Sequence, residues 1–361
     1  MADKEQKHGV AAILRAFSGL DSAKELFSEL NYDIARGTIS RQGWGSKLAR
    51  EALANDPQII AAHEDFQIIY GKLASNRLSI SLQRAVVNTL LREHPYSLFV
   101  FSTQDESQWH FVNVKLATKQ DDEPNKDAKK RRLFRRITIR QNEKRLRTAI
   151  DRLSMLDLAA IQPELFGIPP LTIQSQHDEA FDVEAVTKEF YKAYENLFKE
   201  DLKKNLEKQT GDAQWAHDYA LQFLNRTMFL YFVQRKGWLG GDGEFLETFW
   251  KAYSNSSQPK DTFFDKWLKV LFFEAFNDNK NLLNTEQREY LPQDIRTILW
   301  EAPYLNGGLF KLNMLDTKHD FSISDRLFGR IFNFFQQYNF TITEDSPLDK
   351  EVAVDPEMIG K

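Results

Sequence analysis

The stretch of residues 212–240 constrains the fold more than any other part of the sequence. Between positions 221 and 233 it is apolar nearly all the way round a helix, a pattern typical of a helix buried inside a larger helical domain. Asp212 can accept hydrogen bonds from the free N–H groups at the helix start. Arg235 suits the last turn, and Gly237 is a natural residue just past the end. We therefore predict one long buried helix between these two ends.

Asn225 and Arg226 lie in the middle of this apolar stretch. Buried polar side chains need hydrogen-bonding partners, and most of them serve structure rather than ligand binding. We expect the two residues to tie the helix to neighbouring segments. A ligand site is the alternative.

Composition narrows the class of protein. The chain has 361 residues, no cysteine and a formal net charge of -4, so a Cys-ligated zinc site and a cysteine nucleophile are excluded and any nucleic-acid surface must be local. The first ten residues lack the apolar core of a signal peptide, and the longest apolar run, Met228–Val233, is too short to span a bilayer. We expect a cytoplasmic protein with no membrane partner.

Local patterns divide the chain into two domains and a tail. An α+β N-terminal domain with a small mixed sheet is predicted over 1–162, and the prolines of 163–170 mark its exit. A mostly α-helical connector domain follows over 178–340, and the acidic segment 341–361 begins a unit that the chain does not complete. Within the first domain we predict a loop at 31–45, helices at 81–94 and 145–161, and strands at 65–73, 96–103, 108–116 and 133–139.

The predicted hairpin of 96–116 is the candidate location of a nuclease centre. Metal-dependent nucleases of the restriction type place an acidic residue on one strand and an acid-x-Lys on the next, so that Mg²⁺ and an attacking water are held together. Asp105 and Lys115 are the catalytic candidates, but Asn113 stands where a carboxylate is expected. A second set, Glu64 and Asp65 with Lys72, has unsuitable spacing. No set of metal ligands is predicted. Mg²⁺ is expected as a cofactor only if the domain is a nuclease.

A basic segment is the strongest functional signal in the residues themselves. Ten lysines and arginines fall between positions 129 and 147, and such a cluster can bind DNA phosphates without reading sequence. The alternative is a solvated edge strand protected by charge. The predicted DNA-binding residues are Arg131, Arg132, Arg135, Arg136 and Arg140.

The segment 302–313 contains two adjacent glycines after Asn306. Glycine allows a tight turn there, and we expect that turn to dock Tyr304, Leu305, Leu309 and Phe310 onto the helical core. A domain-docking role is the alternative. No Walker, GxSxG, GxGxxG or HExxH pattern occurs in the chain.

Several stretches together resemble the upstream half of type IIG-like restriction–modification proteins, which fuse a DNA-cleaving or DNA-contacting region to an adenine-specific DNA methyltransferase. The stretches are LFSELNYD (26–33), QWHFVNVK (108–115), LRTAIDRLSMLDL (146–158), AFDVEAVTKEFY (180–191), WAHDYALQFLNRTMFLYFVQRKGWL (215–239), PYLNGGLF (303–310) and YNFTITEDSPLDKEVAVDPEMIGK (338–361). The resemblance covers nearly the whole chain.

The resemblance implies a DNA-engaging N-terminal domain, with a degenerate PD-(D/E)xK-like nuclease as one form of it, followed by a helical connector. A methyltransferase domain is expected after the tail, and its S-adenosylmethionine loop and Asn-Pro-Pro-Tyr motif are absent from this sequence. No cofactor is therefore expected in this chain, and its expected partners are double-stranded DNA and the methyltransferase domain. The alternatives are an active Mg²⁺-dependent endonuclease and a non-catalytic protein-interaction scaffold.

Overall fold

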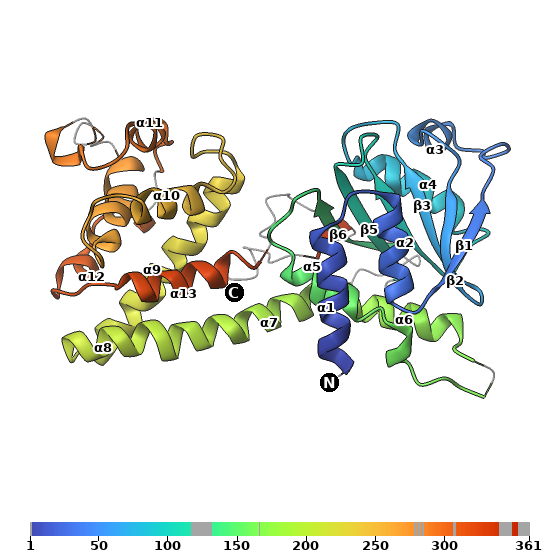
Figure 1. Cartoon of the computed structure of the whole chain (residues 1–361), viewed down its shortest axis with the longest axis horizontal. Helices are drawn as coiled ribbons and strands as arrows, with labels where there is room; N and C mark the ends of the chain where they lie inside the picture. Colours follow the sequence, from blue (N-terminus) through green and yellow to red (C-terminus); the bar gives the residue numbers. More distant parts are fainter. Residues whose placement is uncertain are drawn as a thin grey trace, which may run out of the picture. The chain divides into compact units, whose positions relative to one another are not determined.

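The computed structural model describes residues 2–116, 132–165, 167–277, 280, 283, 285–305, 308–338 and 349–352, with side chains from Gln6 onward. The chain forms two compact units, and the division falls within helix α7 (Val183–Asn196) (Figure 1). The first unit takes in residues up to Thr187 and the late strand β7 (Asp349–Glu351), and the second runs from Lys188 to Gln336.

The first unit is built on a seven-stranded mixed sheet in which the strands lie in sequence order. Besides β7, the strands are β1 (Asp33–Thr38), β2 (Gln58–His63), β3 (Phe66–Lys72), β4 (Ser97–Ser102), β5 (Gln108–Leu116) and β6 (Arg132–Arg140). Neighbours are antiparallel except for the pairs β3–β4 and β6–β7, which are parallel. A parallel pair needs a crossover connection, and helix α4 (Ile80–Leu90) provides it between β3 and β4. The α+β fold with a mixed sheet is confirmed.

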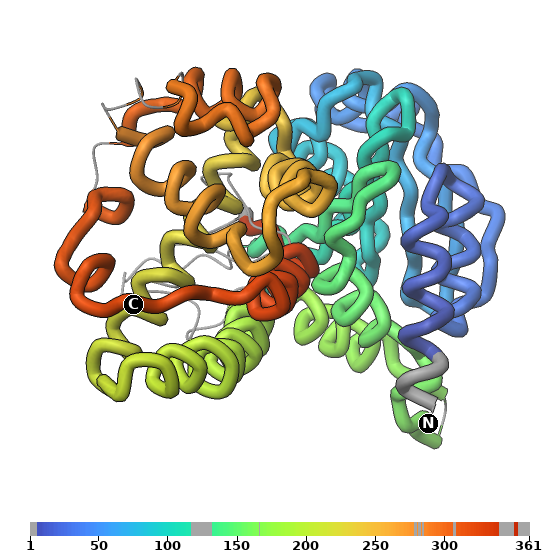
Figure 2. Tube along the Cα trace, turned by 60° about the vertical axis from the view of Figure 1, so that its left-hand side comes forward, coloured from blue at the N-terminus to red at the C-terminus, as the bar shows by residue number. Residues whose placement is uncertain are grey.

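Helices cover both faces of the sheet, as Figures 1 and 2 show. One face packs Ile68, Val100 and Ile137 against one group of helices, and the other packs Phe99 and Phe134 against a second group. The first group is α1 (Ala2–Arg15), α2 (Leu20–Glu29), α5 (Arg147–Ser154), the 3₁₀ turn Leu158–Ala160 and α6 (Pro170–Ala180), and the second is α3 (Lys47–Ala52) and α4. We call these the α6 face and the α4 face.

The strand predictions are confirmed for the strands with many buried residues, and they fail for the strand at the edge of the sheet. The expected strands at 65–73, 96–103, 108–116 and 133–139 are confirmed as β3 to β6. The loop expected at 31–45 is wrong, because β1 lies within it. β1 is an edge strand without a buried residue, and its pairing with β2 shifts between Ile34 and Gly37. It therefore lacks the apolar alternation that identifies a strand from sequence.

The second unit is helical, with an aromatic core around α9 (Ala213–Arg235). The long helix predicted at 212–240 is confirmed: the Asp212 carboxylate accepts from the Trp215 N–H at 2.9 Å, and Gly237 follows the helix with φ of 74°. The other helices are α8 (Lys204–Thr210), α10 (Phe245–Ser254), α11 (Gln293–Glu301), α12 (Met314–Thr317) and α13 (Asp325–Phe335), with π-helices η2 (Leu197–Lys203), η3 (Phe263–Leu268) and η4 (Leu271–Ala275) and 3₁₀ turns η6 (Glu286–Arg288) and η7 (Gly308–Phe310).

Arg226 connects α9 by hydrogen bonds to the segment that contains η7 and α12. This confirms the prediction that the buried side chain ties the helix to a neighbouring segment. Its side chain is fully buried and forms two hydrogen bonds to the Asp316 carboxylate, at 2.6 and 3.0 Å. It also donates to the carbonyl oxygens of Leu309, at 2.5 Å, and Lys311, at 3.2 Å. The neighbouring Asn225 accepts from the Tyr194 hydroxyl at 3.4 Å.

The docking predicted for segment 302–313 is confirmed for Phe310, which is buried against Phe229, Phe272 and Phe276. It is wrong for Tyr304, which is 45% exposed. Asn306 and the glycine after it lie outside the described residues.

The segment 341–361 is described only at 349–352. There β7 extends the sheet beside β6, and the Val352 N–H donates to the Arg136 carbonyl at 2.7 Å. Across the described ranges, no helix combines the length and the apolar character needed to cross a bilayer.

Candidate nucleic-acid interface

Strand β6 carries four of the five predicted DNA-binding arginines, and Arg131 lies outside the described residues. Side chains alternate between the two faces of a strand. Phe134 packs into the core under α4, so Arg132, Arg136 and Arg140 share the α4 face with it. Arg135 points to the α6 face.

Arg132 and Arg84 both lie on the α4 face of the sheet, and each has a partner there. The Arg132 guanidinium donates to the Asn88 side chain of α4 at 2.7 Å. One helical turn earlier on α4, the Arg84 guanidinium lies 5.1 Å from the centre of the Phe134 ring. Arg84 is not among the predicted DNA-binding residues, because its position beside Phe134 of β6 is a tertiary contact that depends on how α4 packs on the sheet.

Arg136 and Arg140 differ in their access to solvent. Arg136 is only 4% exposed, whereas the Arg140 side chain is 38% exposed and lies 3.5 Å from Glu143. Burial, together with the positive charges of these two arginines, holds the pKa of His110 well below its usual range. His110 is therefore neutral and adds no charge, and the buried Arg136 side chain has little access to solvent.

We name Arg84, Arg132 and Arg140 the β6 arginine strip. All three are partly exposed and lie on the α4 face. Arg132 and Arg140 are eight residues apart, which is about 26 Å along a strand. Arg135 stands apart from the strip, opposite Asn113 in the strand register, and its guanidinium donates to the Phe134 carbonyl at 3.1 Å.

The two catalytic candidates of the hairpin do not meet. Asp105 lies in the turn before β5 and Lys115 near the far end of that strand, a separation of about 23 Å. The Asp105 carboxylate accepts from the Thr103 hydroxyl and from the Ser107 N–H and hydroxyl, at 2.6, 3.1 and 2.9 Å. These hydrogen bonds lower its pKa and stabilise the turn.

The second acidic set is separated in the same way. Glu64 and Asp65 precede β3, while Lys72 ends it and pairs with Glu106 at 2.8 Å. Within the part of the chain that the structure describes, no three His, Asp or Glu side chains are placed to hold a metal ion.

Asn113 is fully buried in a small polar cluster with α6. Its amide donates to the Asp178 carboxylate at 2.7 Å, and Gln174 donates to both of them, at 2.9 and 3.0 Å. The structure therefore brings one carboxylate beside the position where an acid-x-Lys motif would have its acid. A two-carboxylate metal site would require another.

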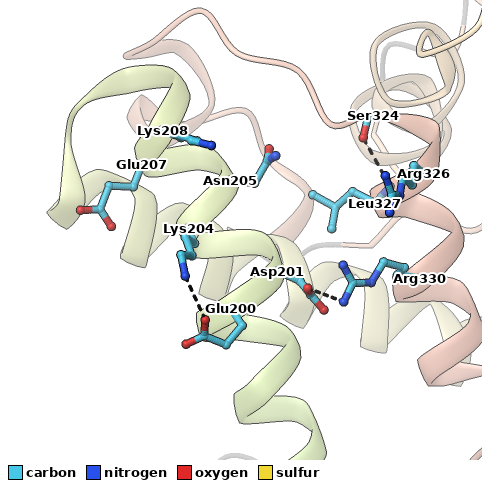
Figure 3. Close-up of a pocket in the computed structure, with 10 residues that line it drawn as sticks. All are labelled: Glu200, Asp201, Lys204, Asn205, Glu207, Lys208, Ser324, Arg326, Leu327 and Arg330. Carbon is cyan, nitrogen blue, oxygen red and sulfur yellow. Dashed lines mark hydrogen bonds and ion pairs between the residues drawn. The ribbon is translucent and has the colours of Figure 1, made fainter.

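The second unit contains a polar groove between η2, α8 and the start of α13, with a volume of about 790 Å³ (Figure 3). Figure 3 shows Arg330 directed at Asp201 and Lys204 at Glu200, at distances of 2.6 and 3.2 Å. The groove is lined by three acidic and four basic side chains, so its charges largely offset one another: Glu200, Asp201, Glu207, Lys204, Lys208, Arg326 and Arg330.

Comparison with known proteins gives one informative relative. The chain is 29% identical over 204 residues to a Methanocaldococcus jannaschii protein assigned as a type II restriction enzyme and methyltransferase. The match covers 49% of this chain and 16% of the relative, so the chain spans a small part of that protein. No family model matches the chain, and no solved structure matches it. The similarity supports a relationship to restriction–modification enzymes.

Proposed function

We propose that this chain is the DNA-engaging N-terminal part and helical connector of a restriction–modification enzyme with an adenine-specific, type IIG-like methyltransferase. In this proposal the enzyme acts in the cytoplasm in defence against foreign DNA. The first unit contacts the duplex backbone, the second unit is the helical connector, and a methyltransferase domain follows 341–361. S-adenosylmethionine binds in that domain and not in this chain.

The β6 arginine strip is the observation that carries the proposal. Guanidinium groups bind phosphates through charge-assisted hydrogen bonds, and the strip length of about 26 Å corresponds to about eight base pairs of B-DNA. Contacts of this kind position a protein on DNA without reading its sequence. The M. jannaschii relative supports DNA as the polyanion, because its assigned name includes restriction and methylation.

The proposal is tested by removing the two exposed β6 charges with Arg132→Gln/Arg140→Gln. We leave Arg136 unchanged, because it is buried and its loss would perturb the fold. Arg36→Gln is the matched control: Arg36 is exposed on β1, at the far end of the strand order from β6, about 24 Å away.

Affinity for a labelled duplex is measured by fluorescence anisotropy at low salt. Each lost phosphate contact reduces the salt dependence of binding by about 0.9 in log–log slope, so we expect the double variant to lose about 1.8 and the control to lose nothing. Equal loss in the control, or unchanged duplex binding in the double variant, would reject the strip as the interface.

The same samples with Mg²⁺, and with EDTA as the control, test the nuclease alternative. Cleavage that requires Mg²⁺ and disappears in Lys115→Met would favour an endonuclease. Binding with little salt dependence would favour a protein-interaction scaffold.

A further inference from the structure

A second groove, distinct from the polar one, lies between α7, η2 and α9 and has a volume of about 650 Å³. Its floor is formed mainly by apolar and aromatic side chains of these elements: Tyr191, Tyr194, Phe198, His217 and Leu221. A volume of this size is typical of sites that enclose small organic groups.

The rings in this groove are fixed by contacts with one another. Tyr191 and Tyr194 lie edge to face with centroids 6.5 Å apart, and Phe198 and His217 do the same at 5.1 Å. Tyr191 is half-buried, His217 is exposed and Leu221 is 43% exposed. These side chains therefore leave aromatic and apolar surface in contact with solvent.

The rim of the groove is basic. Lys188, Lys192 and Lys199 are exposed on α7 and η2, and they extend over about 16 Å of helix. Lys199 is paired with Glu195 at 2.5 Å, whereas Lys188 and Lys192 have no ion pair with any described residue. The groove therefore carries a net positive charge, whereas in the polar groove Lys204 and Arg330 are paired with Glu200 and Asp201.

The backbone of the groove has an unusual geometry. Phe198 and Lys199 belong to the π-helix η2, which separates this groove from the polar one. π-helical turns are rare and occur frequently at functional sites. Here the wide turn interrupts the α-helical spacing between α7 and α8.

We propose that this groove binds an unpaired stretch of a DNA strand, with bases stacked on Tyr191 and His217 and phosphates along Lys188 and Lys192. Non-specific single-strand sites combine aromatic platforms with a positive track in this way. The floor of the groove is apolar and aromatic, which suits stacked bases. Its rim carries lysines, which suit the phosphates of the DNA backbone. The identification of the ligand as DNA rests on the proposed function. The inference that the ligand is a polyanion with stacking rings rests on the side chains of the groove alone.

The test uses the whole chain and a fluorescein-labelled oligothymidylate. Tyr191→Ala should weaken binding about 5- to 150-fold, the range for loss of one base–aromatic stack, and Tyr191→Phe should retain it. Lys188→Gln/Lys192→Gln should lower the log–log salt slope by about 1.4. Lys260→Gln, an exposed lysine of the same unit outside the groove, should change nothing.

Duplex binding by the same variants separates the two proposals. Groove variants that lose oligothymidylate binding but keep duplex binding support the groove proposal. This holds whether or not Arg132→Gln/Arg140→Gln reduces duplex binding. Failure of the native chain to bind oligothymidylate, or unchanged binding in Lys188→Gln/Lys192→Gln, overturns the groove proposal and leaves the duplex proposal standing. Binding of polyglutamate with the same dependence on Tyr191 and the lysines also overturns it and assigns the groove to an acidic peptide. Circular dichroism checks that each variant is folded.

Discussion

Replacement of Arg226 by methionine should destabilise the second unit strongly. The Arg226–Asp316 pair is buried at both ends, with side-chain exposures of 0% and 3%. Without the guanidinium, the hydrogen bonds that the Asp316 carboxylate keeps from the described residues are those from the Asn313 N–H and the Gln222 amide, at 3.0 and 3.2 Å. Removing one partner of a buried pair leaves an uncompensated charge and costs about 3–5 kcal/mol.

The control replaces both partners. Arg226→Met/Asp316→Leu leaves no unpaired charge, so it should be less destabilised than the single variant, in the non-additive manner expected of contacting residues. The carbonyls of Leu309 and Lys311 still lose their donor in both cases, so a residual loss of about 1–3 kcal/mol is expected.

Urea denaturation followed by tryptophan fluorescence provides the assay. Trp215, Trp238, Trp250, Trp267 and Trp300 lie in the second unit, and Trp44 and Trp109 lie in the first. Because two units need not unfold together, the transition must be assigned before a free energy of unfolding is extracted. A loss below about 1 kcal/mol in the single variant, or equal losses in the single and double variants, would refute the reasoning from buried charge.

Three further outcomes are expected in the first unit. Burial lowers the pKa of His177, which is hydrogen-bonded to Tyr32 at 2.8 Å, to about 3. Between that value and its usual pKa the unfolded chain binds more protons, so stability should fall as pH falls through this range, and His177→Phe should flatten a pH series of melting temperatures. Asn113→Asp places a second carboxylate 2.7 Å from that of Asp178 and should lower the melting temperature, with recovery on adding Mg²⁺ only if the pair can hold a metal. The pKa of Asp105 is lowered, so its stabilisation of the turn should be present near neutral pH and lost in acid, and Asp105→Ala should make acid unfolding less steep.

The sequence predicted the elements whose signals are local and strong. The helix around Arg226 shows its apolar surface, its N-cap and its final glycine in the residues themselves. β3 and β4 are largely buried and rich in apolar residues, because both faces of the sheet are covered. β1 was missed because an exposed edge strand need not alternate. Its pairing with β2 is a tertiary contact that no local pattern records.

The candidate site was less predictable, because it depends on register and burial. Asp105 and Lys115 are ten positions apart in sequence, and only the extended conformation of β5 shows that they lie at opposite ends of it. Arg136 and Arg140 look equivalent in the sequence, yet only Arg140 reaches solvent appreciably. Arg84 joins the strip through the crossover helix, a juxtaposition that appears only once α4 is placed on the sheet.

The salt dependence of duplex binding by the unmodified chain tests the central claim most directly. If the three arginines of the β6 arginine strip each neutralise one phosphate, the log–log slope of the binding constant against salt should be about −2.7, and more negative if further basic residues of 129–147 contribute. A slope near zero, or no binding at low salt, would contradict a DNA-engaging role for this chain.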